Sequence, residues 1–185
     1  MGVKVRTGKR ARITQGDIIR DVEYIEYASA KSGNMEISKI IFPLVIVLTQ
    51  DCDLSLDYKY RWSKAETKNE DKWLLSVLVA PLYNVEHIYT GEHLHDIGME
   101  MVKIKRNGTQ GNNLKNNEIP RYHYLEFPSD ISTVSSVIDF KHYFSVNVAY
   151  LKKLKNQNSV CALSELYRED VVQRFSSYLS RIGLP

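Results

Sequence analysis

Three residues with reactive side chains, Asp51, Cys52 and Asp53, directly follow an almost unbroken apolar run at residues 41–48. A carboxylate at the end of a strand can act as a general base, and a thiolate can act as a nucleophile. Two adjacent carboxylates disfavour the thiolate, so the acids are the stronger candidates. The alternative is an ordinary acidic turn, in which the carboxylates accept backbone N–H bonds and Cys52 packs inward.

The chain also contains side chains of the types that bind Zn²⁺ or Mn²⁺. His93 and His95 are separated only by Leu94, so an extended tripeptide would place both imidazoles on one side. There is no CxxC pair and no HExxH motif, and spacing alone is weak evidence. We therefore predict no metal and no other cofactor, and we expect exposed or singly bonded histidines. The residues considered as ligands are Asp51, Cys52, Asp53, His93, His95 and His123.

Basic and aromatic residues indicate contact with nucleic acid. The net charge of +3 is too small to carry this conclusion, but basic residues crowd the first dozen positions, where no acid occurs. Lysine and arginine neutralise phosphates, and aromatic rings stack on bases. The opposing interpretation is that the 12 tyrosines form the core and rim of a β-rich protein and that the basic terminus is a solvated tail. The predicted nucleic-acid-binding residues are Arg6, Lys9, Arg10, Arg12, Tyr58, Tyr60, Trp62 and Tyr122.

Composition predicts a single compact domain. The chain has 185 residues, of which 43% are apolar and 25% charged, enough for one sizeable core. No apolar run approaches the roughly 20 residues that span a bilayer, and the basic first segment lacks the apolar stretch of a secretory signal. Cys52 and Cys161 form no CxxC pair, so no disulfide framework is indicated. We predict a cytoplasmic protein without membrane contact, made of a basic arm (1–14), a β-rich barrel (15–150) and a C-terminal helix (160–183).

Hydropathy patterns outline the elements that would position these residues. Apolar residues alternate with acids after Gly16-Asp17, which predicts a half-solvated strand. Residues 37–50 are almost continuously apolar and predict a strand covered on both faces. Because Pro43 has no N–H to donate to a neighbouring strand, we expect this strand to enter the sheet at or after Pro43. The polar residues 51–72 are typical of a long loop. Residues 73–82 predict a third strand, paired antiparallel with the second.

The second half of the chain is more interrupted. Residues 98–106 carry apolar side chains at helical spacing and predict a short helix, followed by a Gly/Asn-rich loop at 107–117. The lysines of 152–155 indicate only the solvated face of a turn or short helix. Residues 164–182 predict an amphipathic helix with Ser164 as its N-cap. Three more strands are predicted at 121–127, 134–140 and 143–149.

The succession QGDI (15–18), FPLVIVLTQD (42–51) and WLLSVLVAPL (73–82) resembles the front half of the MazF/PemK family, the small SH3-like β-barrels of bacterial toxin–antitoxin systems. The resemblance covers about residues 15–83. It implies an α+β fold, namely a small SH3-like antiparallel barrel to which this chain adds a C-terminal amphipathic helix. It also implies sequence-specific endoribonuclease activity without a metal, and a partner that is an antitoxin-like protein or a second copy.

The family carries an arginine just before the proline and a hydroxyl residue after the strand. This chain has Phe42 before Pro43, and its nearest match to the hydroxyl position is Cys52. Phenylalanine can neither remove a proton nor stabilise a growing charge. If this chain cleaves RNA, it would therefore need Asp51 or Asp53 as the general base and another arginine to stabilise the charge on the phosphate. The predicted catalytic residues are Asp51, Cys52, Asp53, Arg61 and Arg121.

The favoured function is RNA binding by a MazF/PemK-like barrel, with endoribonuclease activity of a toxin–antitoxin or defence type as its catalytic form. The alternative is a non-catalytic module on the same barrel that binds a protein or a nucleotide, and Phe42 favours it. A third hypothesis is a metal-dependent hydrolase. The predicted partners are RNA and either an antitoxin-like protein or a second copy in a homodimer.

Overall fold

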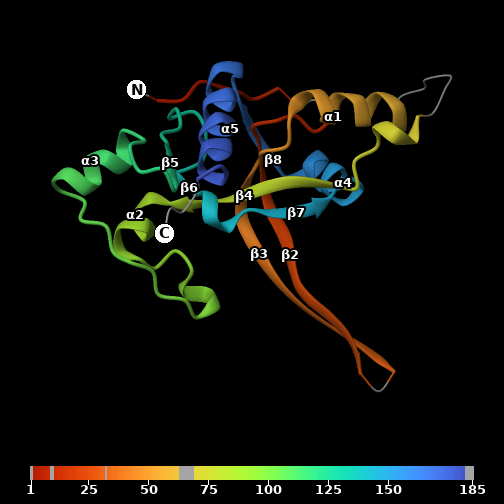
Figure 1. The fold of residues 1–185 in the computed structure, drawn as a ribbon, viewed down its shortest axis with the longest axis horizontal. Helices are drawn as coiled ribbons and strands as arrows, with labels where there is room; N and C mark the ends of the chain where they lie inside the picture. Colours follow the sequence, from red (N-terminus) through yellow and green to blue (C-terminus); the bar gives the residue numbers. More distant parts are fainter. Residues whose placement is uncertain (1, 9–10, 32, 63–68, 182–185) are drawn as a thin grey trace.

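The computed structural model describes residues 2–8, 11–31, 33–62 and 69–181. The fold is mixed α+β (Figure 1), and the described strands form one antiparallel sheet that curls into a half-barrel. This confirms the predicted α+β class with an antiparallel barrel-like sheet. The elements are β1 (Val5–Arg6), β2 (Asp17–Lys31), β3 (Asn34–Val47), α1 (Asp51–Asp57), η1 (Tyr58–Trp62), η2 (Glu70–Lys72), β4 (Ser76–Asn84), α2 (Val85–Thr90), η3 (His95–Ile97), α3 (Thr109–Lys115), β5 (Tyr122–Leu125), β6 (Ser136–Asp139), η4 (Phe140–His142), β7 (Phe144–Asn147), α4 (Val148–Asn158), β8 (Ser159–Leu163) and α5 (Glu165–Leu179).

The strand order joins the two ends of the chain. Among the described residues it runs β1-β8-β2-β3-β4-β6-β5, and β7 pairs with β4 beside this path. The late strand β8 lies between β1 and β2, so the N-terminal segment is fixed by residues near the C-terminus. Helix α5 crosses the sheet (Figure 1) and buries Val171 and Phe175 in the main core, next to Phe140. The predicted C-terminal amphipathic helix is confirmed at Glu165–Leu179, but the predicted span 160–183 begins too early, because residues up to Leu163 form β8.

β2 and β3 form a hairpin that projects beyond the rest of the sheet (Figure 1). We expected β3 to begin at or after Pro43 and to be covered on both faces, but it begins at Asn34 and most of its outer half is exposed. Pro43 is accommodated because the ladder has no pair at its position, where the opposite residue Asp21 has a φ of +57°. The outer half lies in solvent, where a missing backbone N–H costs little.

The polar stretch 51–72 is helical where the structure describes it, and the predicted long loop is wrong there. Helix α1 begins at Asp51 and continues into the π-helical turn η1, and η2 follows at Glu70. Asp51 and Asp53 lie in the first turn of α1, where carboxylates interact favourably with the positive end of the helix dipole. The apolar run therefore ends in acids because a strand is followed by a helix.

The helix predicted at 98–106 is also wrong. The 3₁₀-helix η3 ends before Gly98, whose φ of +75° is left-handed and stops a right-handed helix. The Met101 and Ile104 backbones instead donate hydrogen bonds to the carbonyls of Gly91 and Tyr89. A helix, α3, forms later, in the segment expected to be a Gly/Asn-rich loop.

The lysines of 152–155 do not all face solvent, as we had expected. They lie on α4, and Lys155 is buried with its Nζ 2.5 Å from Asp17 Oδ2 and 2.5 Å from the Arg12 carbonyl. This ion pair joins α4 to the start of β2. Among the described residues, no helix is long and apolar enough to cross a membrane.

Candidate functional site

Asp51, the first predicted catalytic residue, is held by two arginines. Arg12 donates to both of its oxygens at 2.9 Å, the Gln15 N–H donates to Oδ1 at 3.2 Å, and Arg168 lies 3.6 Å away. Burial alone would raise the pKa of Asp51, but the Arg12 hydrogen bonds and charge outweigh it, and the pKa is lowered. A carboxylate so held is a poor proton acceptor, and the geometry favours a structural role at the start of α1.

The other predicted catalytic residues do not form one site with Asp51. Cys52 and Asp53 are exposed in the first turn of α1. Arg61 pairs with Asp57 at 2.7 Å, and Arg121 pairs with Asp139. Each arginine therefore already binds another carboxylate.

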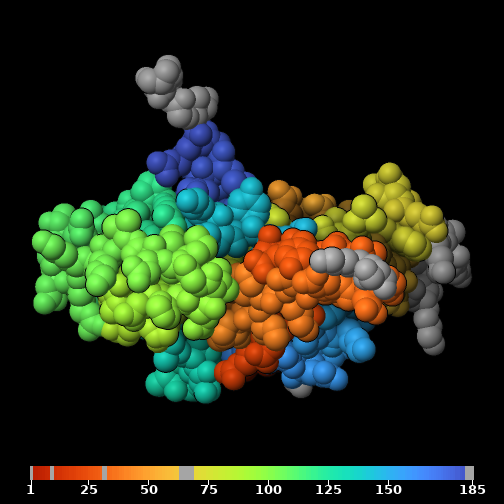
Figure 2. Space-filling view, turned by 90° about the horizontal axis from the view of Figure 1, so that it is seen from below, coloured from red at the N-terminus to blue at the C-terminus, as the bar shows by residue number. Residues whose placement is uncertain are grey.

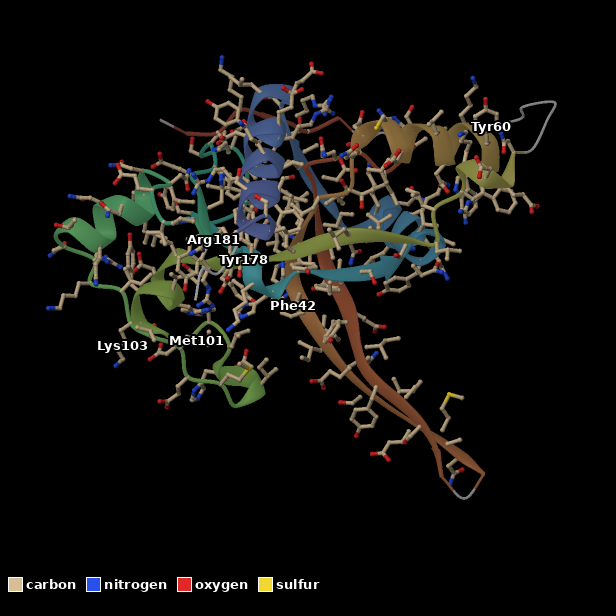
Figure 3. All side chains as sticks on the ribbon, viewed as in Figure 1. Phe42, Tyr60, Met101, Lys103, Tyr178 and Arg181 are labelled. Carbon is tan, nitrogen blue, oxygen red and sulfur yellow. The ribbon has the colours of Figure 1, made fainter. Side chains whose placement is uncertain are left out.

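The predicted nucleic-acid-binding residues are also dispersed. Arg6 lies on β1 opposite Ala162, and Lys9 and Arg10 lie outside the described residues. Tyr58, Tyr60 and Trp62 lie together on η1, at the end of the molecule where Figure 3 labels Tyr60, whereas Tyr122 lies on β5.

The aromatic members of this set have different environments. Lys152 lies over the ring of Trp62, 4.7 Å from its centroid, and 6.0 Å from that of Tyr58. Tyr122 is only 9% exposed and packs in a core, so its ring presents little surface on which a base could stack.

A different group of residues with chemical potential lies where β4, β5 and β6 meet. His93, Asp139 and His142 each place one ligand-type atom within 4.8 Å of the others. His142 Nδ1 is 3.3 Å from Asp139 Oδ2 and 3.1 Å from the Tyr83 hydroxyl. Arg121 donates from Nε to Asp139 Oδ1 at 2.8 Å and from Nη2 to Oδ2 at 2.5 Å. We call these five residues the histidine cluster.

The positions of Asp139 and His142 follow from a local turn. Asp139 ends β6, and its side chain accepts the Lys141 N–H at 3.0 Å, capping the 3₁₀-helix η4. That turn carries His142, three residues on, back to the carboxylate. The Phe140 N–H donates to the Arg121 carbonyl at 3.0 Å, which holds Arg121, just before β5, beside the same turn.

His93 reaches the cluster from the loop after α2, and Gly91 sets the course of that loop. Gly91 has a φ of +77°, and a Cβ there would lie 2.2 Å from the Met101 carbonyl oxygen. Only glycine allows this close approach. The ring centroid of His93 is then 4.9 Å from that of Tyr83 and 6.3 Å from that of His142.

Burial determines the protonation of the cluster. Desolvation lowers the pKa of His142 and of His93, and the nearby charge of Asp139 offsets only part of each shift. Desolvation raises the pKa of Tyr83 far above neutral. Both imidazoles are therefore neutral at pH 7, each with one nitrogen lone pair. Neither ring nitrogen of His93 is solvent-exposed, and neither makes a hydrogen bond of normal geometry to the described residues.

The cluster lies beside a groove between the base of the hairpin and the segment after β4. A cavity of about 560 Å³ is lined by β3 residues 40–44 on one side and by His87, His93 and Leu94 on the other. A second cavity of about 290 Å³ adjoins it and is lined by His142 and Lys141. Figure 2 shows the two walls next to each other, the hairpin in orange and the segment after β4 in green.

This arrangement can do two kinds of chemistry. A neutral imidazole oriented by a carboxylate is a general base. Two imidazoles and a carboxylate are also a ligand set for a zinc-class cation. The two uses exclude each other in His142, because a cation at Nδ1 needs the lone pair there and the proton on Nε2, whereas a base that acts through Nε2 needs the opposite tautomer.

No family model matches the chain, and no curated protein or solved structure matches it either. The resemblance of residues 15–83 to the MazF/PemK family stays a prediction.

Sequence reasoning considered His93 as a ligand and Arg121 as a phosphate contact, but it missed their partners. Asp139 and His142 form the spacing Asp-x-x-His at the end of a strand, a signal that could have identified the turn. Tyr83 carries no such signal, because it reads as one more residue of a β-strand.

Proposed function

We propose that the chain binds RNA in the groove and cleaves it at the histidine cluster. The contact of His142 Nδ1 with Asp139 Oδ2, at 3.3 Å, carries the proposal. Nδ1 lies 3.3 Å from this carboxylate and 3.1 Å from the Tyr83 hydroxyl. With the proton on Nδ1, the lone pair is on Nε2, and the ring is 17% exposed beside the adjoining cavity. This is the arrangement of a general base held by an acid.

The proposed reaction uses the 2′-hydroxyl of RNA. His142 Nε2 takes the proton as the 2′-oxygen attacks the adjacent phosphorus. The bond from phosphorus to the 5′-oxygen breaks, and that oxygen takes a proton from water in the groove. The products are a 2′,3′-cyclic phosphate and a 5′-hydroxyl. Arg121 uses two of its five donors on Asp139, which leaves others for the charge that grows on phosphate.

The groove carries charges of both signs, since Asp21, Asp96, Glu26 and Glu86 line it, and we assign its cations to the phosphates of RNA. Arg20 lines the larger cavity and Lys141 lines the adjoining one. A third cavity, of about 260 Å³, shares Asn84 with the larger one and is lined by Arg106 and Lys115. Cations spaced along a groove neutralise successive phosphates of a single strand.

An SH3-like barrel of MazF/PemK type is the finer fold that accompanies this function. The curled antiparallel sheet and the motifs in residues 15–83 support it. A toxin of this type would be cytoplasmic and would be restrained by an antitoxin-like partner or act as a homodimer.

Cleavage of mixed-sequence, end-labelled RNA in EDTA tests the proposal. We expect the wild-type chain to produce cyclic-phosphate ends and His142→Ala to cut about 10²- to 10⁴-fold more slowly, the usual contribution of a general base. RNA with 2′-deoxy substitutions should resist cleavage. The matched control is His95→Ala, which removes an exposed imidazole outside the cluster.

Two results would refute the catalytic proposal. One is intact RNA after incubation with the wild-type protein, with or without divalent ions. The other is wild-type cleavage by His142→Ala together with loss of cleavage in Asp53→Asn, an exposed residue of the site predicted from sequence. Circular dichroism of each variant separates lost chemistry from lost structure.

The hairpin favours a second candidate, the non-catalytic interaction module. Ile25, Met35, Ile37 and Ile41 are between 52% and 73% exposed on β2 and β3. An isolated two-stranded hairpin is marginally stable in water, so an exposed apolar one suits protein binding. Sedimentation of the wild type against Ile37→Lys tests self-association through this surface, and equal masses at all concentrations would exclude a homodimer there.

A further inference from the structure

We propose that His93, Asp139 and His142 form a binding site for one zinc-class divalent cation. The three ligand atoms lie within 4.8 Å of one another and come from the loop after α2, the end of β6 and η4. Two imidazoles and one carboxylate are a common set for Zn²⁺ with an open position. The binding of the cation does not depend on whether the chain cleaves RNA. Only the effect of the cation on cleavage rests on the proposed function.

One edge of the site already has the dimensions of a metal site. Ligand atoms about 2.0–2.1 Å from Zn²⁺ in tetrahedral geometry are about 3.3–3.4 Å apart. His142 Nδ1 and Asp139 Oδ2 are 3.3 Å apart. The His93 ligand atom lies within 4.8 Å of both, and its ring would supply the third corner.

Asp139 has a lone pair available for the cation. A carboxylate offers about four lone-pair positions. Arg121 Nε and the Lys141 N–H occupy Oδ1, and Arg121 Nη2 occupies one position on Oδ2. The remaining position on Oδ2 faces His142. Hydrogen bonds to a ligating carboxylate are typical of the shell around a metal, and here they hold Asp139 in place.

The environment of His93 is a second observation that indicates a ligand. Both of its ring nitrogens are buried and lack hydrogen-bond partners of normal geometry among the described residues. A buried polar group without a partner destabilises the fold. A cation between His93 and His142 would remove this cost.

Metal binding would inhibit the proposed cleavage. A cation bound at His142 Nδ1 leaves the proton of the neutral ring on Nε2, so Nε2 can no longer accept a proton from a 2′-hydroxyl. We therefore expect EDTA to preserve activity and stoichiometric Zn²⁺ to suppress it.

Titration of the EDTA-treated, dialysed protein with Zn²⁺ and Co²⁺ tests the site. Calorimetry should give one Zn²⁺ per chain, and bound Co²⁺ should give the visible absorption of a tetrahedral complex. His93→Ala and His142→Ala should each weaken binding at least tenfold. His95→Ala, which removes an exposed imidazole of the same loop region, should bind as the wild type does.

The outcomes for the metal and for cleavage are distinguishable. Absence of stoichiometric binding, or equal affinity in His93→Ala and wild type, overturns the metal site whether or not RNA is cut. Binding that depends on both histidines supports the site even where RNA stays intact. Asp139→Asn is unsuitable as the main test because Asp139 is fully buried against Arg121, and its loss could disrupt the fold.

Discussion

Removing either partner of the Lys155–Asp17 ion pair should destabilise the fold strongly, because both side chains are only 4% exposed. Lys155 Nζ donates to Asp17 Oδ2 and to the Arg12 carbonyl, both at 2.5 Å. Asp17 also accepts the Thr14 N–H at 2.6 Å and the Thr14 hydroxyl at 2.7 Å. Replacing one partner leaves the other charge buried without compensation, a change that costs about 3–5 kcal/mol.

A double-mutant cycle measures this contribution. We expect Lys155→Met and Asp17→Asn each to lower the free energy of unfolding by about 3–5 kcal/mol. The double variant should lose less than the sum of the two by about 2–3 kcal/mol, because it leaves neither charge stranded. Urea unfolding followed by circular dichroism provides the values.

The control is Lys153→Met, an exposed residue on the same helix, which should change stability by no more than about 0.5 kcal/mol. Single-variant losses below about 1 kcal/mol that add without coupling would refute the reasoning. They would mean that water reaches the pair and screens both charges.

Three further predictions concern groups near the ends of the sheet. Burial lowers the pKa of His123 to about 3, so the folded state binds a proton on this ring less readily than the unfolded state does. The free energy of unfolding should therefore be highest above about pH 6.5 and fall toward pH 3, with a loss of about 2 kcal/mol at pH 5. Urea titrations at each pH should show a smaller loss in His123→Gln. Asp51→Asn should cost about 1–2 kcal/mol by weakening the contact with Arg12 and leave RNA cleavage unchanged. Gly91→Ala should cost about 1–3 kcal/mol, because its Cβ would meet the Met101 carbonyl, and it should also slow cleavage by displacing the loop of the cluster.

The sequence predicted elements best where the hydropathy period was clear. β2, β3 and β4 were found because alternation and apolar runs report burial directly. The beginning of β3 was misplaced because Pro43 was taken as a barrier to pairing. The free-energy cost of a proline in a strand depends on whether the neighbouring strand needs the missing N–H. Here the ladder has no pair at Pro43.

Short helices were harder to predict than strands. Residues 98–106 have helical spacing, but the left-handed Gly98 and the contact of Met101 with Gly91 determine their path. The contact of Met101 with Gly91 is a tertiary contact, which no local sequence pattern contains. The same applies to Lys155, which looks solvated in sequence and is buried because Asp17 lies opposite.

The candidate site escaped sequence reasoning for a related reason. Asp51, Cys52 and Asp53 are adjacent in sequence, and adjacency made them look like a site. Their acids are accounted for by the start of a helix. The histidine cluster instead joins a loop, three strand ends and a turn, so only the fold brings its members together.

A purely structural role for the histidine cluster would predict that each buried polar atom has a partner, since an unpaired one costs about 1–3 kcal/mol. Asp139 and Arg121 meet that condition with two hydrogen bonds to each other. His93 does not, because both of its nitrogens are buried beside a groove and make no hydrogen bond of normal geometry among the described residues, although the His87 backbone lies close to the ring. A hydrophobic side chain would pack there without that cost. The imidazole is therefore better explained by something that enters the groove, a phosphate with its hydroxyl or a cation, than by the stability of the fold.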